Sequence, residues 1–302
     1  MMPYGRKAKK MNFIKKTAVY AAAALMLLTA VPFSASAEEK APDPIAWYTF
    51  DDANNFGKDK MGKYDMTCHN GNGTPKSVKG AVGKAIELDG DYCLALPKDN
   101  DFSGKVKSFT IAYYAKRDRD NQLPWETPIS LAKFRIMHRI DEGDNDFMHV
   151  TADREDWWIT QQFEKGTFSD ALNLYTLTVE VGGGKTVVTY YLNGVKVGDK
   201  SFEKEYSYAD GNLTFAVGSQ ANADGWYYGE KGHCFKGVID EVRVWDKALT
   251  AEQVSAAAKA DKQPGGDNDP TPTPPTSDGV AAVCAVIVAA AGAAVIAKKK
   301  RG

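Results

Sequence analysis

The middle of the chain consists of short runs of β-branched and aromatic residues that are separated by glycine, asparagine and aspartate. Such runs with turn residues between them predict strands joined by tight turns. The strongest turn signal is Asn193-Gly194, because both central residues of a type I′ hairpin need a positive φ. Helical periodicity is absent here, so we expect an all-β fold. The expected strands are 85–88, 92–96, 108–114, 174–181, 186–192, 195–197, 213–217 and 238–245.

The last expected strand leads into a single helix. The segment Thr250-Ala-Glu-Gln253 has the residues of a capping box, and alanine-rich sequence continues to Lys259. Within the strand itself, alternate residues should point to the same face of the sheet. This alternation puts Asp240 in a row of valines, where a carboxylate needs a partner if that face is buried. The expected row is Val238, Asp240, Val242 and Val244.

The N-terminal segment differs from the β-rich middle. A basic start is followed by an apolar run from Thr17 to Ala30 and by the small-residue site Ala35-Ser-Ala37. These features together predict a secretory signal peptide over residues 1–37. A membrane anchor is the alternative, but the apolar run is short for a bilayer.

The C-terminal segment has the composition of a membrane anchor. Residues 279–297 carry no charge and are mostly alanine and valine, which predicts a transmembrane helix. The basic tail, residues 298–302, is then expected in the cytoplasm. A proline- and threonine-rich linker, residues 261–278, separates this helix from the β-rich region. A buried core helix is the alternative for 279–297, and its terminal position and abrupt basic stop argue against it.

The end of the linker and the helix that follows it resemble a Gram-positive sortase sorting signal. In the segment from Thr273 to Ser277, threonine replaces the family's leucine at the first position and serine replaces its glycine at the last. The second change lies at the bond that a sortase would cleave. We therefore expect a retained membrane anchor, and wall attachment stays open.

Charge is distributed unevenly along the 302 residues. The ten basic residues of the two ends leave the middle with a net charge of about −11. An acidic domain argues against a nucleic-acid partner, because that binding depends on lysine and arginine neutralising phosphates. We expect one exported domain, residues 41–260, on the outside of a bacterial membrane.

Five segments, in order, resemble the laminin-G-like branch of the concanavalin A-like lectin/glucanase jelly rolls. These relatives are two-sheet antiparallel β-sandwiches, and the resemblance covers nearly the whole of 41–260. The most specific segment runs from Phe235 to Val254 and resembles the closing strand and short helix of the family. The other four are Ala46–Asp52, the pair Gly83–Gly90 and Tyr92–Pro97, Ser108–Ala112, and Tyr191–Val197.

The resemblance implies recognition of glycans or proteins, and often a structural calcium. In related jelly rolls, an acid on the opening strand and an acid in the closing strand share the ion, which points to Asp51 or Asp52 together with Asp240. Calcium prefers several hard oxygen ligands, and converging carboxylates would repel one another without a cation. The alternative is that Asp51 and Asp52 cap a turn while Asp240 accepts backbone hydrogen bonds. A second acidic stretch, 141–146, lacks EF-hand spacing and is expected to be a hairpin loop.

Catalytic signatures are sparse in the sequence. The G-x-S-x-G nucleophile elbow, the H-E-x-x-H zinc-binding helix and the phosphate-binding P-loop are absent, and the four histidines have no metal-ligand spacing. Some glucanases of this fold use alternating acids on one strand, and Glu87-Leu-Asp89-Gly-Asp91 is superficially similar. However, Gly90 and Asp91 have the composition of a turn, and a glutamate that the glucanase pattern needs is missing. We therefore expect no enzymatic activity.

Aromatic residues near turn signals are the candidate ligand contacts. Sugars present apolar C–H faces, and exposed aromatic rings supply matching surface. Core packing is the alternative for each of these residues, and one of the adjacent tryptophans is expected to take it. The candidates are Trp226, Tyr227, Tyr228, Trp157, Trp158 and Trp125.

The cysteines constrain the fold little. Cys284 lies in the expected membrane span, which leaves the odd number of three outside it: Cys68, Cys93 and Cys234. Cys68 and Cys93 are the nearer pair in an exported domain, but whether any disulfide forms stays open. The sequence thus favours a non-catalytic surface module that binds carbohydrate. A protein-binding adhesin or structural surface protein is the alternative, and a glycoside hydrolase is the least favoured.

Overall fold

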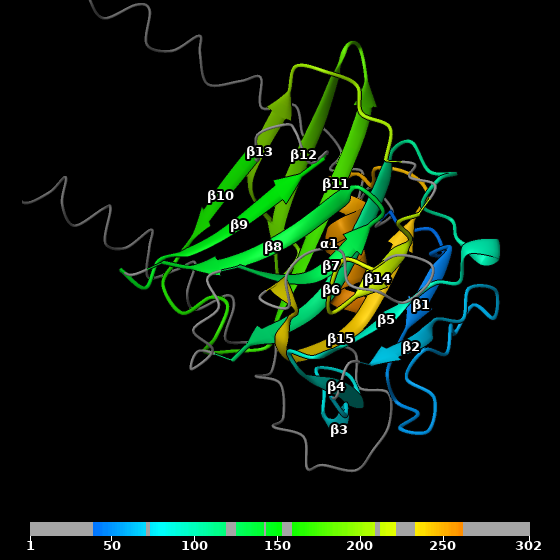
Figure 1. Cartoon of the computed structure of the whole chain (residues 1–302). Coiled ribbons are helices and arrows are strands. Elements are labelled where there is room, and N and C mark those ends of the chain that lie inside the picture. The colour runs from blue at the N-terminus through cyan, green and yellow to red at the C-terminus, as the bar shows by residue number, and fades with distance from the viewer. Residues whose placement is uncertain are drawn as a thin grey trace, which may run out of the picture. The chain divides into compact units, whose positions relative to one another are not determined.

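The computed structural model describes residues 39–70, 73–118, 125–141, 143–152, 159–208, 212–221 and 233–261, without the side chains of 68–70. The signal peptide, linker, transmembrane helix and basic tail expected from the sequence lie outside these residues. In the described part of the chain, no helix is both long and apolar enough to cross a membrane. The expected all-β sandwich with one short C-terminal helix is confirmed (Figure 1).

The larger of the two sheets contains most of the strands expected from the sequence. All of its pairings are antiparallel, and β1 (Ala46–Tyr48) joins it through β15. Its other strands, in spatial order, are β13 (Val195–Phe202), β12 (Lys185–Leu192), β11 (Asn173–Gly182), β6 (Phe109–Arg117), β15 (Lys236–Trp245), β4 (Lys84–Asp89) and β3 (Lys76–Lys79).

The smaller sheet contains the expected strands 92–96 and 213–217 together with five strands that the sequence did not predict. Its seven strands are also antiparallel neighbours. In spatial order they are β10 (Ile159–Phe163), β9 (Asp146–Thr151), β8 (Phe134–Ile140), β7 (Glu126–Leu131), β14 (Phe215–Val217), β5 (Tyr92–Ala95) and β2 (Thr67–Asn70).

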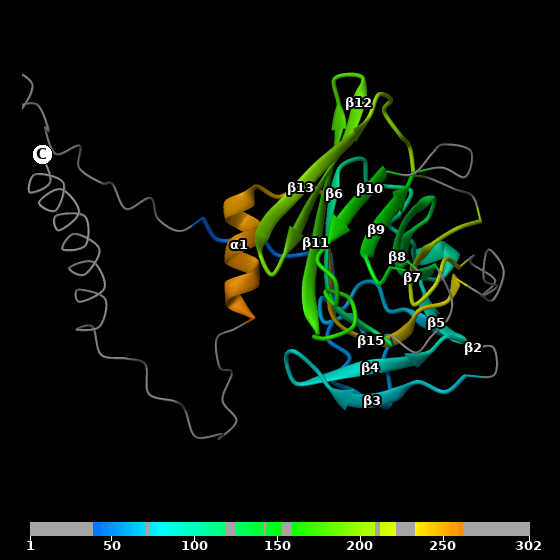
Figure 2. The same ribbon diagram turned by 90° about the vertical axis from the view of Figure 1, so that its left-hand side faces the viewer.

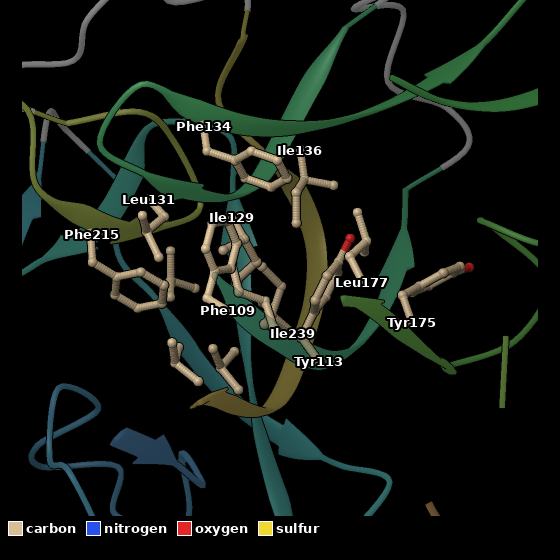
Figure 3. Close-up of a cluster of buried hydrophobic side chains, with 14 of the residues drawn as sticks. Phe109, Tyr113, Ile129, Leu131, Phe134, Ile136, Tyr175, Leu177, Phe215 and Ile239 are labelled. Atoms are coloured by element: carbon tan, nitrogen blue, oxygen red, sulfur yellow. The ribbon is translucent and has the colours of Figure 1, made fainter. Parts of the chain in front are cut away.

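Aromatic side chains fill the space between the two sheets. Phe109 on the larger sheet contacts the ring of Phe134 on the smaller sheet edge to face, at 4.9 Å between centroids (Figure 3). Both rings are fully buried, as are Tyr113 and Phe215. Burying one such side chain contributes roughly 1.5–3 kcal/mol, so this layer holds the sheets face to face.

The helix α1 (Ala251–Ala260) covers the outer face of the larger sheet, opposite the smaller sheet (Figure 2). Its expected capping box is confirmed, since Thr250 and Gln253 bond each other's backbone N–H groups. Val254 and Ala258 pack on the same outer cluster as Trp245 of β15. A short 3₁₀ turn, η1 (Lys98–Asn100), follows β5.

The hairpin expected at Asn193-Gly194 is also confirmed. It joins β12 to β13, and its two central residues have φ values of 52° and 83°. Asn193 accepts the backbone N–H of Leu174 on the neighbouring strand through its side-chain oxygen. The turn therefore fixes the register of three adjacent strands.

The alternation expected for the last strand is wrong beyond Ile239. The register of β15 against β6 shifts between Asp240 and Arg243, and Glu241 has a φ of 51°. An extra residue on one strand changes which side chains face the core. Ile239 and Val242, which strict alternation would separate, both lie in the core. Asp240 is therefore not in one row with Val242.

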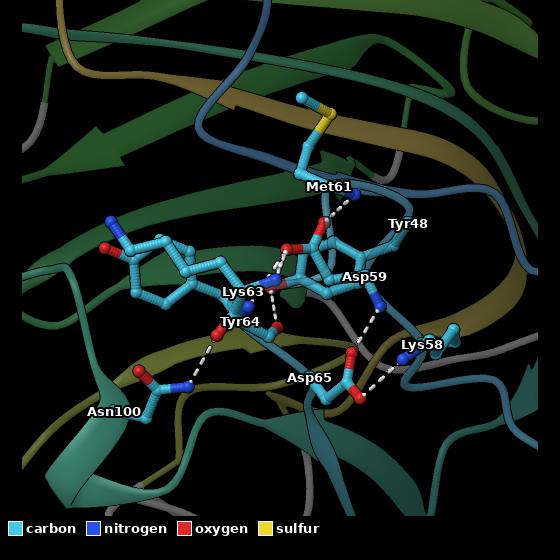
Figure 4. A network of polar contacts seen from close by, with 8 residues as sticks. All are labelled: Tyr48, Lys58, Asp59, Met61, Lys63, Tyr64, Asp65 and Asn100. Carbon is cyan, nitrogen blue, oxygen red and sulfur yellow. Dashed lines mark hydrogen bonds and ion pairs between the residues drawn. The ribbon is translucent and has the colours of Figure 1, made fainter.

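A single carboxylate organises the segment between β1 and β2. Asp59 is only 1 % exposed, and its two oxygens accept the backbone N–H groups of Met61, Lys63 and Tyr64 at 2.9–3.0 Å (Figure 4). It also accepts the backbone N–H of Trp47 at 2.9 Å. This connection has no regular structure that could satisfy those donors. The carboxylate takes that role and ties the segment to β1.

We expect Asp59→Ala to lower the free energy of unfolding by about 3 kcal/mol or more, because it leaves several buried N–H groups without an acceptor. Urea unfolding followed by tryptophan fluorescence measures this loss. Asp99→Ala is the control, since Asp99 is an exposed carboxylate in the 3₁₀ turn η1. Equal losses in the two variants would contradict the role given to Asp59.

Candidate functional site

The outer face of the smaller sheet is set by alternation along its central strands. On β8, Phe134 and Ile136 point into the core, so Arg135, Met137 and Arg139 point outward. The register pairs Arg139 with Phe147 of β9. In turn, Phe147 pairs with Gln162 of β10 on the same face.

Trp125, directly before β7, lies on this outer face. The guanidinium carbon of Arg139 is 4.7 Å from the centroid of the indole ring. The ring of His149 on β9 is also 4.7 Å from Trp125, and His149 Nδ1 lies 2.8 Å from the hydroxyl of Thr160 on β10. We call these residues the Trp125 surface: Trp125, Arg139, Phe147, His149, Thr160 and Gln162.

Exposure distinguishes this surface from the other aromatic clusters. Among the aromatic side chains that the structure describes, every one is buried except Trp47, Trp125 and Phe147. Trp47 is held between two cations, with Lys60 at 3.6 Å and Arg243 at 4.5 Å from its ring. The two remaining partly exposed rings, Trp125 and Phe147, are both on the Trp125 surface.

The electrostatics of the Trp125 surface come from one arginine and a neutral histidine. Burial, and secondarily the charge of Arg139, lower the pKa of His149 from 6.5 to about 4. The imidazole is therefore uncharged at neutral pH and can exchange hydrogen bonds with hydroxyl groups. Arg139 keeps its positive charge.

The acids of the neighbouring strands point away from this surface into the sandwich. Glu126 on β7 is fully buried and forms an ion pair with Arg117 of β6 at 3.0 Å. Asp146 on β9 is also fully buried, and one of its oxygens accepts the N–H of Phe168 at 2.9 Å. Between them, the ring of His138 stacks on Phe168 at 4.1 Å.

Of the aromatic residues predicted from the sequence, only Trp125 lies in the described part. Trp157, Trp158, Trp226, Tyr227 and Tyr228 are outside it. Arg139, Phe147, His149, Thr160 and Gln162 were missed. The alternation of apolar and polar residues within 134–140 and 146–151 was the signal that could have found them.

The three carboxylates predicted to hold calcium each have backbone partners. Both oxygens of Asp240 are used, since one accepts the N–H groups of Ala81 and Val82 and the other accepts that of Glu241. Asp51 accepts the N–H of Lys84, at the end of the same turn, and Asp52 accepts the N–H of Asn54.

These contacts match the alternative in which the acids satisfy backbone donors. Within the described ranges, no group of three or more His, Cys, Asp or Glu side chains could hold a metal ion. Calcium binding by Asp51, Asp52 and Asp240 is not tested by these contacts and stays a prediction of the sequence.

A groove of about 410 Å³ lies at the end of the larger sheet, where β3, β4, β6 and β15 meet. Its walls include Glu87 and Asp89, the first two acids of the glucanase-like run. Glu87 is 3.9 Å from the ammonium group of Lys76. Asp89 accepts the N–H groups of Thr74 and Asp91 and so closes a turn. Both carboxylates thus have structural partners.

The cysteines that can be placed are buried. Cys93 lies on the outer side of β5 in a small cluster with Ala95, Ala216 and Ala221, and the thiol of Cys234 lies 3.6 Å from the hydroxyl of Ser219. The side chain of Cys68 is not among those described, so its suggested pairing with Cys93 stays open.

Comparison with known proteins identifies the superfamily. A laminin G family model, described as the concanavalin A-like lectin/glucanases superfamily, matches residues 88–255, more than half of the chain. No curated protein matches the chain.

Several solved structures are similar to this chain. Domain 4 of AbnA, a GH43 extracellular arabinanase from Geobacillus stearothermophilus in complex with arabinotriose, is 24% identical with a TM-score of 0.51. The match covers 73% of this chain and 100% of that domain.

Two toxin binding domains are also similar. The binding domain of Paraclostridial Mosquitocidal Protein 1 is 16% identical, with a TM-score of 0.48 and coverage of 67% of this chain and 49% of that one. The binding domain of botulinum neurotoxin serotype D is 14% identical, with a TM-score of 0.48 and coverage of 72% and 52%.

We expect His149 to make stability depend on pH. The folded chain keeps this ring neutral down to a pKa of about 4, whereas the unfolded chain takes up a proton near 6.5. The contribution of His149 to the free energy of unfolding is therefore fully present above pH 6.5 and is lost as the pH falls toward 4. His138, whose pKa burial lowers well below 6.5, acts in the same direction.

Urea unfolding at pH values between 7 and 5 measures this slope, and His149→Gln should reduce it because glutamine does not titrate. An unchanged slope in the variant, or an NMR titration showing His149 protonated at pH 6 in the folded protein, would contradict the prediction.

Proposed function

Because the chain belongs to the concanavalin A-like lectin/glucanases superfamily, we propose that it is a non-catalytic carbohydrate-binding protein whose ligand contacts the Trp125 surface. The proposal is carried by one observation. Trp125 and Phe147 are partly exposed on this face, whereas nearly all the other aromatic rings that the structure describes are buried. Half-exposed rings beside polar groups are suited to the C–H faces and hydroxyls of a sugar.

The polar groups around the two rings support this assignment. His149 and Thr160 form a hydrogen-bonded pair at 2.8 Å, and the amide of Gln162 is exposed beside Phe147. These neutral groups can donate to and accept from hydroxyls. Because these groups lie on adjacent strands of a rigid sheet, they lose little conformational entropy when a ligand binds.

The similar fold of the arabinanase domain gives the first probe. That domain was solved in complex with arabinotriose, and this chain covers its whole length. Arabino-oligosaccharides are therefore the first neutral ligands to test.

We propose a binding role and not hydrolysis because the acids near the Trp125 surface are engaged elsewhere. Glu126 is paired with Arg117, and Asp146 accepts a backbone N–H inside the sandwich. The signal peptide and the transmembrane helix predicted from the sequence further suggest that this binding protein is a receptor displayed on a bacterial surface by a membrane anchor.

We expect Trp125→Ala to weaken the binding of a recognised oligosaccharide by tenfold or more, since stacking on an aromatic ring contributes on the order of 1 kcal/mol or more and the ring also orients Arg139. Isothermal titration calorimetry of the full-length protein, with arabinotriose and a panel of other neutral and acidic oligosaccharides, measures the change. Met61→Ala is the control, because Met61 is exposed on the connection between β1 and β2. The proposal would be abandoned if no oligosaccharide in the panel bound.

Calcium has a separate test. If the ion predicted from the family resemblance is bound, EDTA lowers the melting temperature, added calcium restores it, and Asp240→Ala removes the effect. A melting curve that EDTA leaves unchanged would remove calcium from the account and leave the binding proposal intact.

A further inference from the structure

The outer face of the smaller sheet around the Trp125 surface carries positive charge, and its strands, in the part of the chain that the structure describes, place no carboxylate there. Four strands form it, and the only two acids in those strands, Glu126 and Asp146, point into the core. The side chains that alternation places on the outer face are Ser130, Arg135, Met137, Arg139, Phe147, His149, Thr151, Thr160 and Gln162. None of these is acidic.

This distribution is opposite to that of the rest of the protein. The chain as a whole has more acids than bases, and the β-rich middle is strongly acidic. A cationic face on an acidic domain attracts anionic ligands while the rest of the surface repels them.

Arg139 is at the centre of this face. Its guanidinium lies over the indole of Trp125 at 4.7 Å, and it pairs across the strands with Phe147. Its Nε atom is buried and makes no hydrogen bond. Stacking can hold a guanidinium plane in a fixed orientation, and the edge formed by its two terminal nitrogens can donate to a planar, bidentate acceptor.

One acid, Asp141, lies close to Arg139 in the sequence. Asp141, in the hairpin between β8 and β9, interacts with Arg139 through its charge, but one of its oxygens already accepts the N–H groups of Gly143 and Asn145.

The geometry points to a sugar that bears a carboxylate, a uronic acid, as the ligand of the Trp125 surface; this inference rests on the function proposed above. Arg139 binds the carboxylate, the rings of Trp125 and Phe147 contact the C–H face of the sugar, and Thr160, which His149 orients from below, and Gln162 bind hydroxyls. A phosphate or sulfate ester can accept from the same guanidinium edge, so a sulfated oligosaccharide is a separate arm of the test.

The test compares each acid with its methyl ester, which keeps the shape of the sugar and removes its charge. Oligomers of galacturonic, glucuronic and mannuronic acid, their methyl esters, arabinotriose and sulfated oligosaccharides are titrated into the full-length protein. We expect at least one acid to bind tenfold or more tightly than its ester, and its affinity to fall as salt is raised.

Variants of Arg139 identify the group responsible. Arg139→Gln should remove the preference for the acid over the ester. Arg139→Lys should keep part of it, because an ammonium group is a point charge without a bidentate edge. Lys79→Gln is the matched control, since Lys79 is exposed on β3 of the other sheet. Melting curves show that each variant is folded.

The outcomes separate this inference from the proposed function. Equal affinity for an acid and its ester, or an unchanged preference in Arg139→Gln, overturns the inference and leaves carbohydrate binding in place. Binding of arabinotriose without any uronide does the same, as does tighter, Arg139-dependent binding of a sulfated oligosaccharide. If no carbohydrate binds, the proposed function itself fails.

Discussion

The bulge in β15 is the constraint on which much of the sandwich depends. This strand pairs with β1, β4 and β6, so it determines the centre of the larger sheet. Two consecutive acids, Asp240 and Glu241, would place one carboxylate in the core if the strand alternated strictly. Instead, the strand contains an extra residue at this point, where Glu241 has a positive φ. Ile239 and Val242 therefore both point into the core.

The displaced acids then organise the outside of the larger sheet. Asp240 holds the turn between β3 and β4 through the N–H groups of Ala81 and Val82. Glu241 accepts the indole N–H of Trp47 at 2.6 Å and pairs with Arg243, which also binds Asp261 after α1. One irregularity thereby links the first strand, a distant turn and the end of the helix. The raised pKa of Asp240, about 7, is chiefly a consequence of its burial.

The two outer faces consequently have different roles. The larger sheet buries Trp245 and its neighbours under α1 and surrounds Trp47 with cations. The smaller sheet has no helix on its outer face in the described part of the chain, and it retains partly exposed Trp125 and Phe147 there. Its acids are neutralised or hydrogen-bonded inside the sandwich, which leaves Arg135 and Arg139 as the charged side chains that its described strands place on the outer face. This division is the basis of the recognition surface proposed above.

Local patterns in the sequence determined the fold class, the Asn193-Gly194 hairpin and the capped helix, because turn and cap preferences act over only a few residues. They did not identify β7 to β10, because β7 contains a proline, β8 and β9 each place a polar residue, His138 or Asp146, inside the sandwich, and β10 is mostly polar. They could not locate the bulge either. The tertiary structure alone decided that Asp240 meets Ala81 and Val82, and that Trp125, Arg139 and His149 share one face. Those contacts join residues far apart in sequence, and only strand pairing brings them together.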